Sequence, residues 1–234
     1  MKHFQTRPLY LQLHDALAER IASGQWKPGL IPNEGELARE FGVSAGTVRK
    51  ALDLLEAEHI VTRRQGRGTF VNDQTVDQLA SRFSNIRALD GRRIAGDFRE
   101  CKILRARPNE AERERLGLGE NDHVYRIHRI RVDGDQPFMV EDVSLPAARF
   151  PTIAVPIPDI VALAQQHGVV LGKAEERVTI KVATPAVSKL LAIPNNTAVL
   201  VLDRVVCCLD GRSAEWRVGF CHLGTAYMYT AELG

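Results

Sequence analysis

Three short helical patterns followed by one hairpin fill the first 71 residues, and this order constrains the fold more than any other feature of the chain. The first helix is predicted to start at Pro8 and to stop at Gly24, because an aliphatic residue recurs every four positions between them. Asn33, with Glu36 three residues later, has the pattern of a capping box. This pattern predicts that a second helix begins at residue 34 and runs to about Phe41.

A third helix is predicted after a turn of about four residues. Gly42 suits a left-handed helix stop, and Ser44 suits the N-cap of a helix that runs to about Glu58. Two helices joined by such a glycine-containing turn form a helix-turn-helix. One stripe of the third helix is apolar and is expected to pack inward, which leaves the opposite side outward. The inward positions are Val48, Ala51, Leu52 and Leu55, and the outward positions are Thr47, Arg49, Lys50 and Asp53.

A β-hairpin with a basic tip is predicted directly after the third helix. Strand-like residues at 60–64 and 69–71 flank the tight turn Gln65-Gly66-Arg67-Gly68. The formal net charge of the chain is only +2, so a basic surface has to be local. Arg63, Arg64 and Arg67 supply such a surface, because no acidic residue lies among them. The hairpin therefore has the character of a DNA-contacting wing.

The order of the elements predicts which residues contact DNA. A recognition helix places its N-terminal end in the major groove, and glycines in a wing let the backbone approach a phosphate. An ordinary amphipathic helix would account for the third helix alone, but not for three helices followed by a basic, glycine-rich hairpin. The predicted DNA-binding residues are Ser44, Thr47, Arg49, Lys50, Arg64, Gly66 and Arg67.

The pattern changes after the hairpin, and the chain is predicted to hold two domains. Residues 1–71 form the winged helix-turn-helix, 72–75 a linker, and 76–234 a second domain rich in strands. We expect an α+β protein whose second domain is an antiparallel sheet with packed helices. Strands are predicted at 124–132, 138–145, 177–183, 198–209 and 213–222, and helices at 158–167 and 186–192.

Charged residues on apolar strand faces indicate a pocket in the second domain. Arg129 and Arg131 share a face with Ile127, and Glu141 shares its face with Val143 and other apolar residues. A carboxylate on an apolar face is costly unless it is paired with an arginine or a ligand donor. A purely structural Arg–Glu pair and a ligand pocket both satisfy this requirement, and the pattern leaves both open. As a pocket, two arginines favour a small polar, anionic ligand such as a carboxylate or phosphate.

Several motifs between residues 8 and 71 occur together in one known family. They are Pro8-Leu9-Tyr10, Ile31-Pro32, Glu36-Leu37-Ala38, Phe41-Gly42-Val43-Ser44, Thr47-Val48-Arg49, Ala51-Leu52 and the segment Arg64 to Val71. As a set they resemble the GntR family. The resemblance implies a homodimeric transcriptional regulator that binds a pseudo-palindromic operator in double-stranded DNA. The chain departs from the family pattern at Asn33-Glu34-Gly35 and at Ala45-Gly46, so a different operator half-site is expected.

The second domain resembles the UTRA effector domain of the HutC-type subfamily, whose fold is similar to chorismate lyase. The matching parts are Arg129-Ile130-Arg131, Glu141, Leu145-Pro146, Leu202-Asp203-Arg204 and Glu215-Trp216-Arg217. The resemblance implies an effector cavity lined by Arg129, Arg131, Glu141, Glu215 and Arg217. The segment Ile94 to Phe98 lacks the Ser/Thr-rich loop of members that bind sugar phosphates, which leaves open whether the effector is phosphorylated.

No pattern of an enzyme, a metal site or a membrane segment is present. The seven histidines and four cysteines have no metal-ligand or catalytic spacing, so no catalytic residue, metal or cofactor is expected. No stretch of about 18 apolar residues occurs, and the first residues lack the apolar core of a secretory signal. We expect a cytoplasmic protein without a membrane partner and with reduced thiols.

These observations predict a transcriptional repressor whose operator affinity is controlled by a small anionic metabolite bound in the C-terminal domain. The alternative is a constitutive DNA-binding regulator whose second domain only dimerises. An enzyme is the third hypothesis, and no motif of the chain favours it.

Overall fold

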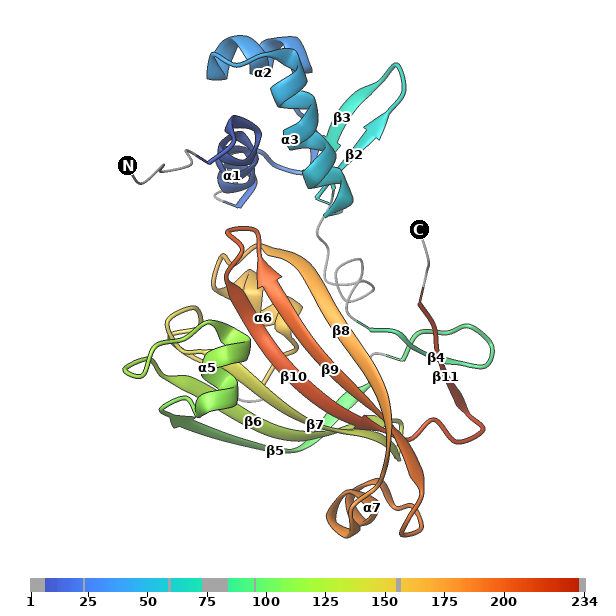
Figure 1. Cartoon of the computed structure of the whole chain (residues 1–234). Coiled ribbons are helices and arrows are strands. Elements are labelled where there is room, and N and C mark those ends of the chain that lie inside the picture. Colours follow the sequence, from blue (N-terminus) through green and yellow to red (C-terminus); the bar gives the residue numbers. More distant parts are fainter. Residues whose placement is uncertain are drawn as a thin grey trace. The chain divides into compact units, whose positions relative to one another are not determined.

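Three helices form most of the first unit of the chain, Met1–Thr75: α1 (Leu9–Ala22), α2 (Glu34–Phe41) and α3 (Ala45–Ala57) (Figure 1). The second unit is Val76–Gly234. This computed structural model describes residues 7–22, 24–58, 60–72, 84–94, 96–154 and 157–231.

Local capping interactions fix both ends of the turn between α2 and α3. The Asn33 side chain accepts a hydrogen bond from the Glu36 N–H at 3.0 Å, and the Glu36 carboxylate accepts one from the Asn33 N–H at 2.9 Å. Gly42 takes the left-handed conformation with φ +63°, which only glycine adopts without a steric penalty. Ser44 then caps α3 by accepting from the Thr47 N–H at 3.1 Å. The predicted helix-turn-helix is confirmed.

The predicted inward stripe of α3 is the centre of the first core. Its four residues are buried, together with Leu13 and Leu17 of α1 and Leu37 of α2. The hairpin is made of β2 (Val61–Arg64) and β3 (Gly68–Val71). A two-residue strand, β1 (Gly29–Leu30), pairs with β3 and completes a sheet of order β1-β3-β2. Strand β1 was not predicted, because Lys27-Pro28-Gly29 has only the pattern of a turn.

A buried histidine links the first helix to the end of the third. His14 is 5% exposed, and its Nε2 lies 3.0 Å from the Glu58 carboxylate, while Nδ1 lies 3.1 Å from Asp15. The hydrogen bond to Glu58 raises the pKa of His14 above the ordinary histidine value, although burial opposes this. The charged imidazolium is therefore favoured in the folded unit.

One antiparallel sheet of six strands, in the order β5-β6-β7-β10-β9-β8, is the frame of the second unit. A separate pair, β4 (Ile86–Ala88) and β11 (Tyr227–Tyr229), joins the two ends of this unit. The strands of the sheet are β5 (Asp97–Ala106), β6 (Val124–Asp133), β7 (Gln136–Pro146), β8 (Leu171–Val182), β9 (Ala198–Cys208) and β10 (Ser213–Cys221).

One face of this sheet is apolar at both ends and charged between them. Along β7, Val143 packs in the cluster under α6 (Ile160–Gln166), and Met139 packs in a second cluster with Ile86 of β4. Glu141 lies midway between Val143 and Met139. Strand β9 repeats this order with Val206, Arg204 and Leu202. Because side chains two apart share a face, the charged residues of neighbouring strands meet in the middle of the apolar face.

Two short helices cover the opposite face. Helix α5 (Glu110–Leu116) is tied to β6 and β7 through Glu112, which accepts hydrogen bonds from Arg126 and Ser144. Helix α7 (Pro185–Leu191) packs its Leu191 against the other ends of β6 and β7.

The predicted α+β fold class is confirmed, and most strand predictions are correct. Both hairpins and helices α6 and α7 lie within a few residues of the predicted ranges. Strand β8 starts six residues earlier than the predicted residue 177, at Leu171. Elements β4, β5, α5 and β11 were not predicted. Of the predicted linker 72–75, Asn72 is described, and 73–75 lie outside the described residues.

The described ranges contain no helix long and apolar enough to cross a membrane, and no group of three or more His, Cys, Asp or Glu residues that could hold a metal ion. Cys207, Cys208 and Cys221 are free thiols. Burial raises the pKa of Cys208 to about 11 and that of Cys221 to about 12.

The His14–Glu58 contact predicts a pH-dependent stability of the first unit. A group whose pKa is raised by folding stabilises the fold below its unfolded pKa of ~6.5, and this contribution is lost as the pH rises through the folded pKa. We expect the free energy of unfolding to fall between about pH 6 and pH 8, and His14→Gln to flatten that dependence. Urea denaturation followed by Trp26 fluorescence in a Trp216→Phe background measures it. An unchanged slope in the His14→Gln variant would contradict the assignment.

Candidate DNA-binding surface and effector site

The N-terminal end of α3 presents the residues predicted to enter the major groove. Ser44 is exposed and Thr47 half-buried, and their hydroxyl oxygens lie 2.9 Å apart, so capping holds both side chains in place. Lys50 is exposed, with its ammonium 5.8 Å from the ring centre of Tyr10. A rigid helix end with short polar side chains is the arrangement that groove recognition requires.

Arg49 is exposed on α3, but it already has an acidic partner. Its Nη2 donates a hydrogen bond to the Glu34 carboxylate at 3.0 Å, and this bond raises the pKa of Arg49. The Arg49 carbonyl accepts a hydrogen bond from Arg63 at 2.9 Å. Arg49 is thus positioned by its neighbours on α2 and the wing before any DNA is present.

The wing turns two of its arginines outward and one inward. Gly66 has φ +70° in the turn, where Arg67 is exposed. Arg64 lies over the Phe70 ring at 5.0 Å. Arg63 instead contacts Asp53 at 2.7 Å and Glu56 at 3.7 Å, both on α3. Its predicted place in the basic surface is therefore corrected: the Arg63 guanidinium joins the wing to α3.

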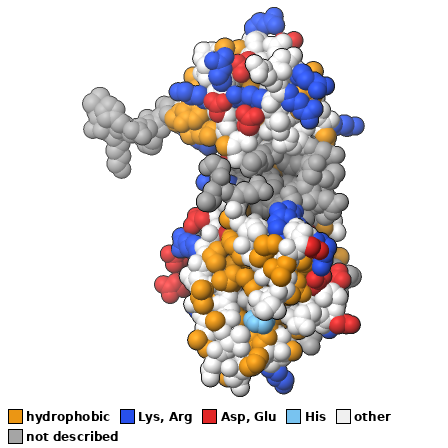
Figure 2. Space-filling model, turned by 90° about the vertical axis from the view of Figure 1, so that its right-hand side faces the viewer, with side chains coloured by type: hydrophobic (Ala, Val, Ile, Leu, Met, Phe, Trp, Pro, Cys, Tyr) orange, Lys and Arg blue, Asp and Glu red, His pale blue; other side chains and the backbone are white. Residues whose placement is uncertain are grey.

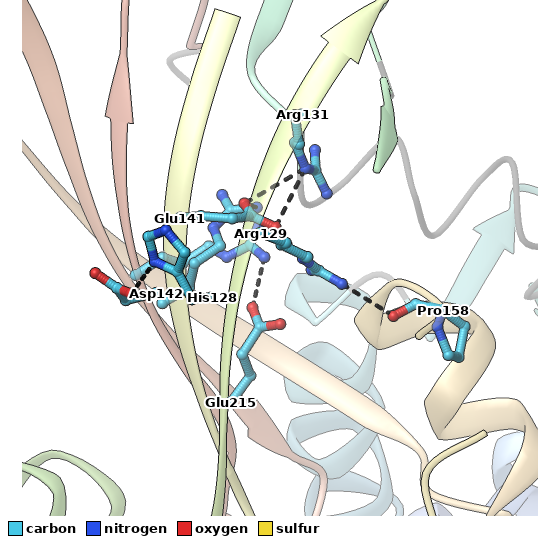
Figure 3. A network of polar contacts seen from close by, with 9 residues as sticks. His128, Arg129, Arg131, Glu141, Asp142, Pro158 and Glu215 are labelled. Carbon is cyan, nitrogen blue, oxygen red and sulfur yellow. Dashed lines mark hydrogen bonds and ion pairs between the residues drawn. The ribbon is translucent and has the colours of Figure 1, made fainter. Parts of the chain in front are cut away.

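In the second unit, a buried cluster of charged residues surrounds Glu141 (Figure 3). Arg129 Nε donates to Glu141 Oε1 at 2.5 Å, and Arg131 Nε lies 3.4 Å from the same carboxylate. Arg217 reaches Glu141 at 3.5 Å and Glu176 of β8 at 3.6 Å. These contacts join side chains of β6, β7, β8 and β10, and Glu141 is the residue at which three of the arginines meet.

A second ion pair, a stacked ring and a backbone carbonyl extend this cluster. Arg204 Nη2 donates to Glu215 at 2.7 Å. The Phe98 ring lies under both Arg129 and Arg131, at 3.8 Å and 5.0 Å from its centroid to the guanidinium carbons. Arg129 also donates to the Pro158 carbonyl at 3.2 Å, which connects the cluster to the segment before α6. Planar guanidinium groups stack on aromatic faces in this way.

Among the described residues, more guanidinium groups than carboxylates take part in these ion pairs. Four guanidinium groups, of Arg129, Arg131, Arg204 and Arg217, face the three carboxylates of Glu141, Glu176 and Glu215. Burial opposes the ionisation of Glu141, yet the three nearby arginines hold its pKa well below the usual range. Burial lowers the pKa of Arg131 to about 10, which still leaves it charged at neutral pH.

Glu141 Oε2 and Arg217 Nε are among the buried polar atoms of this cluster that make no hydrogen bond within the described part of the chain. An unsatisfied buried donor is costly and is a common mark of a binding site. A ligand oxygen placed near Arg217 would satisfy its Nε.

The structure brings all five predicted effector residues into one network. Three further members were not predicted: Arg204, Glu176 and Phe98. The only sequence signal for Arg204 and Glu176 is a charged residue at a strand position whose neighbours two residues away are apolar, such as Leu202 and Val206 beside Arg204.

A hollow of about 370 Å³ lies on the opposite face of the sheet, beside α5. His128 and Asp142 point into this side and form a pair at 2.7 Å, turned away from Arg131 in Figure 3. Its lining residues include Lys102, Leu104, Arg126, Ser144 and Trp216. Positive and negative side chains are balanced here, unlike in the buried cluster.

A winged helix-turn-helix joined to a sheet domain with a buried arginine cluster defines a class of DNA-binding transcriptional regulators. Residues 9–71 match the family described as bacterial regulatory proteins, gntR family, and residues 92–225 match the UTRA domain. The chain belongs to the GntR family and carries a UTRA domain.

Named relatives agree with this assignment. The chain is 28% identical to the mannosyl-D-glycerate transport/metabolism system repressor MngR of Escherichia coli, over 90% of each chain. It is 26% identical to the HTH-type transcriptional repressor NagR of Bacillus subtilis, over 89% of this chain and 88% of that protein. The solved structure of the possible transcriptional regulator YydK of Bacillus subtilis has a TM-score of 0.56 at 15% identity and covers 97% of this chain and 100% of that one. This last likeness concerns the fold.

Removal of the central carboxylate is predicted to destabilise the second unit strongly. Glu141→Gln would leave three buried arginines around a neutral amide, and breaking a buried ion pair costs about 3–5 kcal/mol. The neighbouring change Asp142→Asn is the matched control, because the Asp142 side chain is 64% exposed. We expect the control to stay within about 0.5 kcal/mol of the wild type. Urea denaturation monitored by Trp216 fluorescence in a Trp26→Phe background compares them. Equal stability of the two variants would contradict the charge balance described.

Proposed function

We propose that this chain is a homodimeric transcriptional repressor that releases its operator when a small anionic metabolite binds in the buried cluster around Glu141. The observation that carries the proposal is the gathering of buried guanidinium groups around Glu141, in a site kept dry by apolar clusters on both sides. Charge-assisted hydrogen bonds to arginine are strongest where water is excluded. A carboxylate or phosphate group fits this environment.

Repression is supported by the relatives, two of which are named repressors. Only the name of MngR states a compound, so the two names support the type of regulation and not a particular ligand. The proposed DNA contacts are those of Ser44, Thr47, Arg49, Lys50, Arg64, Gly66 and Arg67, with α3 in the major groove and the wing on the backbone. Two recognition helices related by a twofold axis would read half-sites roughly 34–36 Å apart.

Release follows if effector and operator favour different geometries of the dimer. The two ligands then act on one equilibrium, and their coupling is reciprocal, typically ~1–3 kcal/mol in either direction. The rival function is a constitutive regulator whose second unit only dimerises. A melting-temperature screen with mono- and dicarboxylates and sugar phosphates separates the two, because only an effector domain gains stability from a ligand.

The wing and recognition helix are predicted to contact phosphates. Arg67→Ala should weaken binding to specific and random duplexes alike and should reduce the slope of log affinity against log salt by about 1. Arg49→Ala should act in the same way, unless Arg49 reads a guanine, in which case ~1–3 kcal/mol is lost at one base position. Arg105→Ala, an exposed arginine on β5, is the matched control. Fluorescence anisotropy across a salt titration measures the affinities, and an unchanged slope in both variants would exclude the proposed contacts.

The buried cluster and the hollow on the opposite face can be tested against each other. Arg131→Ala should bind operator DNA with wild-type affinity but fail to release it when an effector found in the screen is added. His128→Ala, on the opposite sheet face, should still release. The reverse pattern would move the effector to the hollow beside α5. Loss of operator binding in Arg131→Ala with effector affinity intact would assign Arg131 to the scaffold.

A further inference from the structure

Strand β8 is an unusual edge for a sheet of this size. It is twelve residues long and lies at one end of the strand order, so one side of its backbone has no partner strand among the described residues. Natural sheets protect such edges with prolines, bulges, short strands or charged side chains, and beyond Ala174 strand β8 has only the charged side chains. Between Ala174 and Val182 the strand pairs with β9 without a break, and its only register shift lies before Ala174.

The side chains of β8 place an apolar stripe in solvent. Val178, Ile180 and Val182 are 41%, 71% and 61% exposed, and their spacing of two puts them on one face. The other face carries Lys173, Glu175, Arg177 and Lys181. Figure 2, which views the side of the second unit that carries β4, β8 and β11, shows hydrophobic side chains gathered on that side. Contiguous β-branched residues on a long open edge favour the addition of another strand.

The opposite edge of the sheet lacks these properties. Strand β5 has a register shift in its middle, between Arg99 and Lys102, and charged residues interrupt its apolar ones. Leu104 is nevertheless 60% exposed on this strand. Ile103 beside it is 39% exposed, but consecutive residues of a strand point to opposite faces, so the two form no stripe.

We propose that β8 pairs with β8 of a second copy of this chain, antiparallel and with Ile180 on the twofold axis. This pairing would set Ile180 against Ile180 of the second copy, and Val178 against Val182. All six apolar side chains would then cover one another. Because a twofold interface uses the same patch on both subunits, one self-complementary strand is sufficient to form it.

Charge on the other face of β8 favours the same register. With Ile180 on the axis, Lys181 lies opposite Thr179 and Arg177 opposite Ala183, so no like charges are paired. With Thr179 on the axis, Arg177 would face Lys181, and with Lys181 on the axis two lysines would meet. Like charges directly opposite each other destabilise a strand pair. The requirement for a twofold dimer rests on the proposed function, whereas the register rests on the residues of β8.

The oligomeric state of charge variants tests this interface. The wild-type chain is expected to have twice its 26.0 kDa mass in light scattering after size exclusion. Ile180→Lys should reduce the mass to that of one chain, because two ammonium groups would meet on the axis. Leu104→Lys on β5 introduces the same charge at a similar exposure and should leave the dimer intact. A dimeric Ile180→Lys, a monomeric wild type or a monomeric Leu104→Lys would each overturn the proposal.

Cysteine cross-linking tests the register without relying on the loss of a dimer. Paired residues on antiparallel strands have Cα atoms ~4.5–5.5 Å apart, which a disulfide can span. Ile180→Cys should therefore form a covalent dimer on mild oxidation, whereas the wild type and Leu104→Cys, which share the native cysteines, should not. Absence of the cross-link in Ile180→Cys would overturn the register. None of these measurements contains DNA, so failure of the wild type to bind any duplex would refute the proposed function and leave the interface standing.

Discussion

The second unit depends on the charge balance around Glu141. Burial of a carboxylate costs several kcal/mol, and only close, well-oriented partners recover that cost. Here those partners are Arg129 and Arg131 of β6 and Arg217 of β10. Phe98 and the Pro158 carbonyl hold Arg129 in place. The apolar clusters at both ends of the same sheet face exclude water and so strengthen each contact. One group of residues thus orders the strands and gathers the guanidinium groups on which the proposed effector site depends.

Most of the first unit was predictable from sequence, because its signals are local. The capping box at Asn33, the left-handed Gly42 and the cap at Ser44 each act within four residues, and the structure has all three. The missed elements depend on distant partners. Strand β4 pairs with β11 near the end of the chain, and β5 is an edge strand in which a bulge and charged residues hide the alternation. Helix α5 was missed although Asn109 and Glu112 form the same capping box as Asn33 and Glu36, because five of its seven residues are charged and leave no apolar period.

Part of the candidate effector site was predictable, because the alternation of side chains along a strand decides which residues share a face. Arg129, Arg131 and Glu141 could be placed on an apolar face from their own strands. The contribution of Glu176 could not be predicted, because it requires β8 to lie beside β9. No single segment of the sequence determines the order of strands in a sheet. Arg63 shows the same limit in the first unit: its partners Asp53 and Glu56 belong to α3, and only the packed hairpin brings them within reach.

The contact between Arg49 and Glu34 has a consequence for how such a protein searches a genome. Glu34 already accepts a hydrogen bond from Arg49 Nη2, so if Arg49 contacts DNA as proposed, a phosphate that approaches this donor has to displace the carboxylate. Binding to arbitrary sequence relies almost wholly on phosphate contacts and is weakened by this competition. A cognate site offers further contacts that repay the displacement. If the cost is the same at every site, the acidic residue lowers the affinity for all DNA alike, so that only a site with such further contacts holds the protein, while the ratio between right and wrong sites is unchanged.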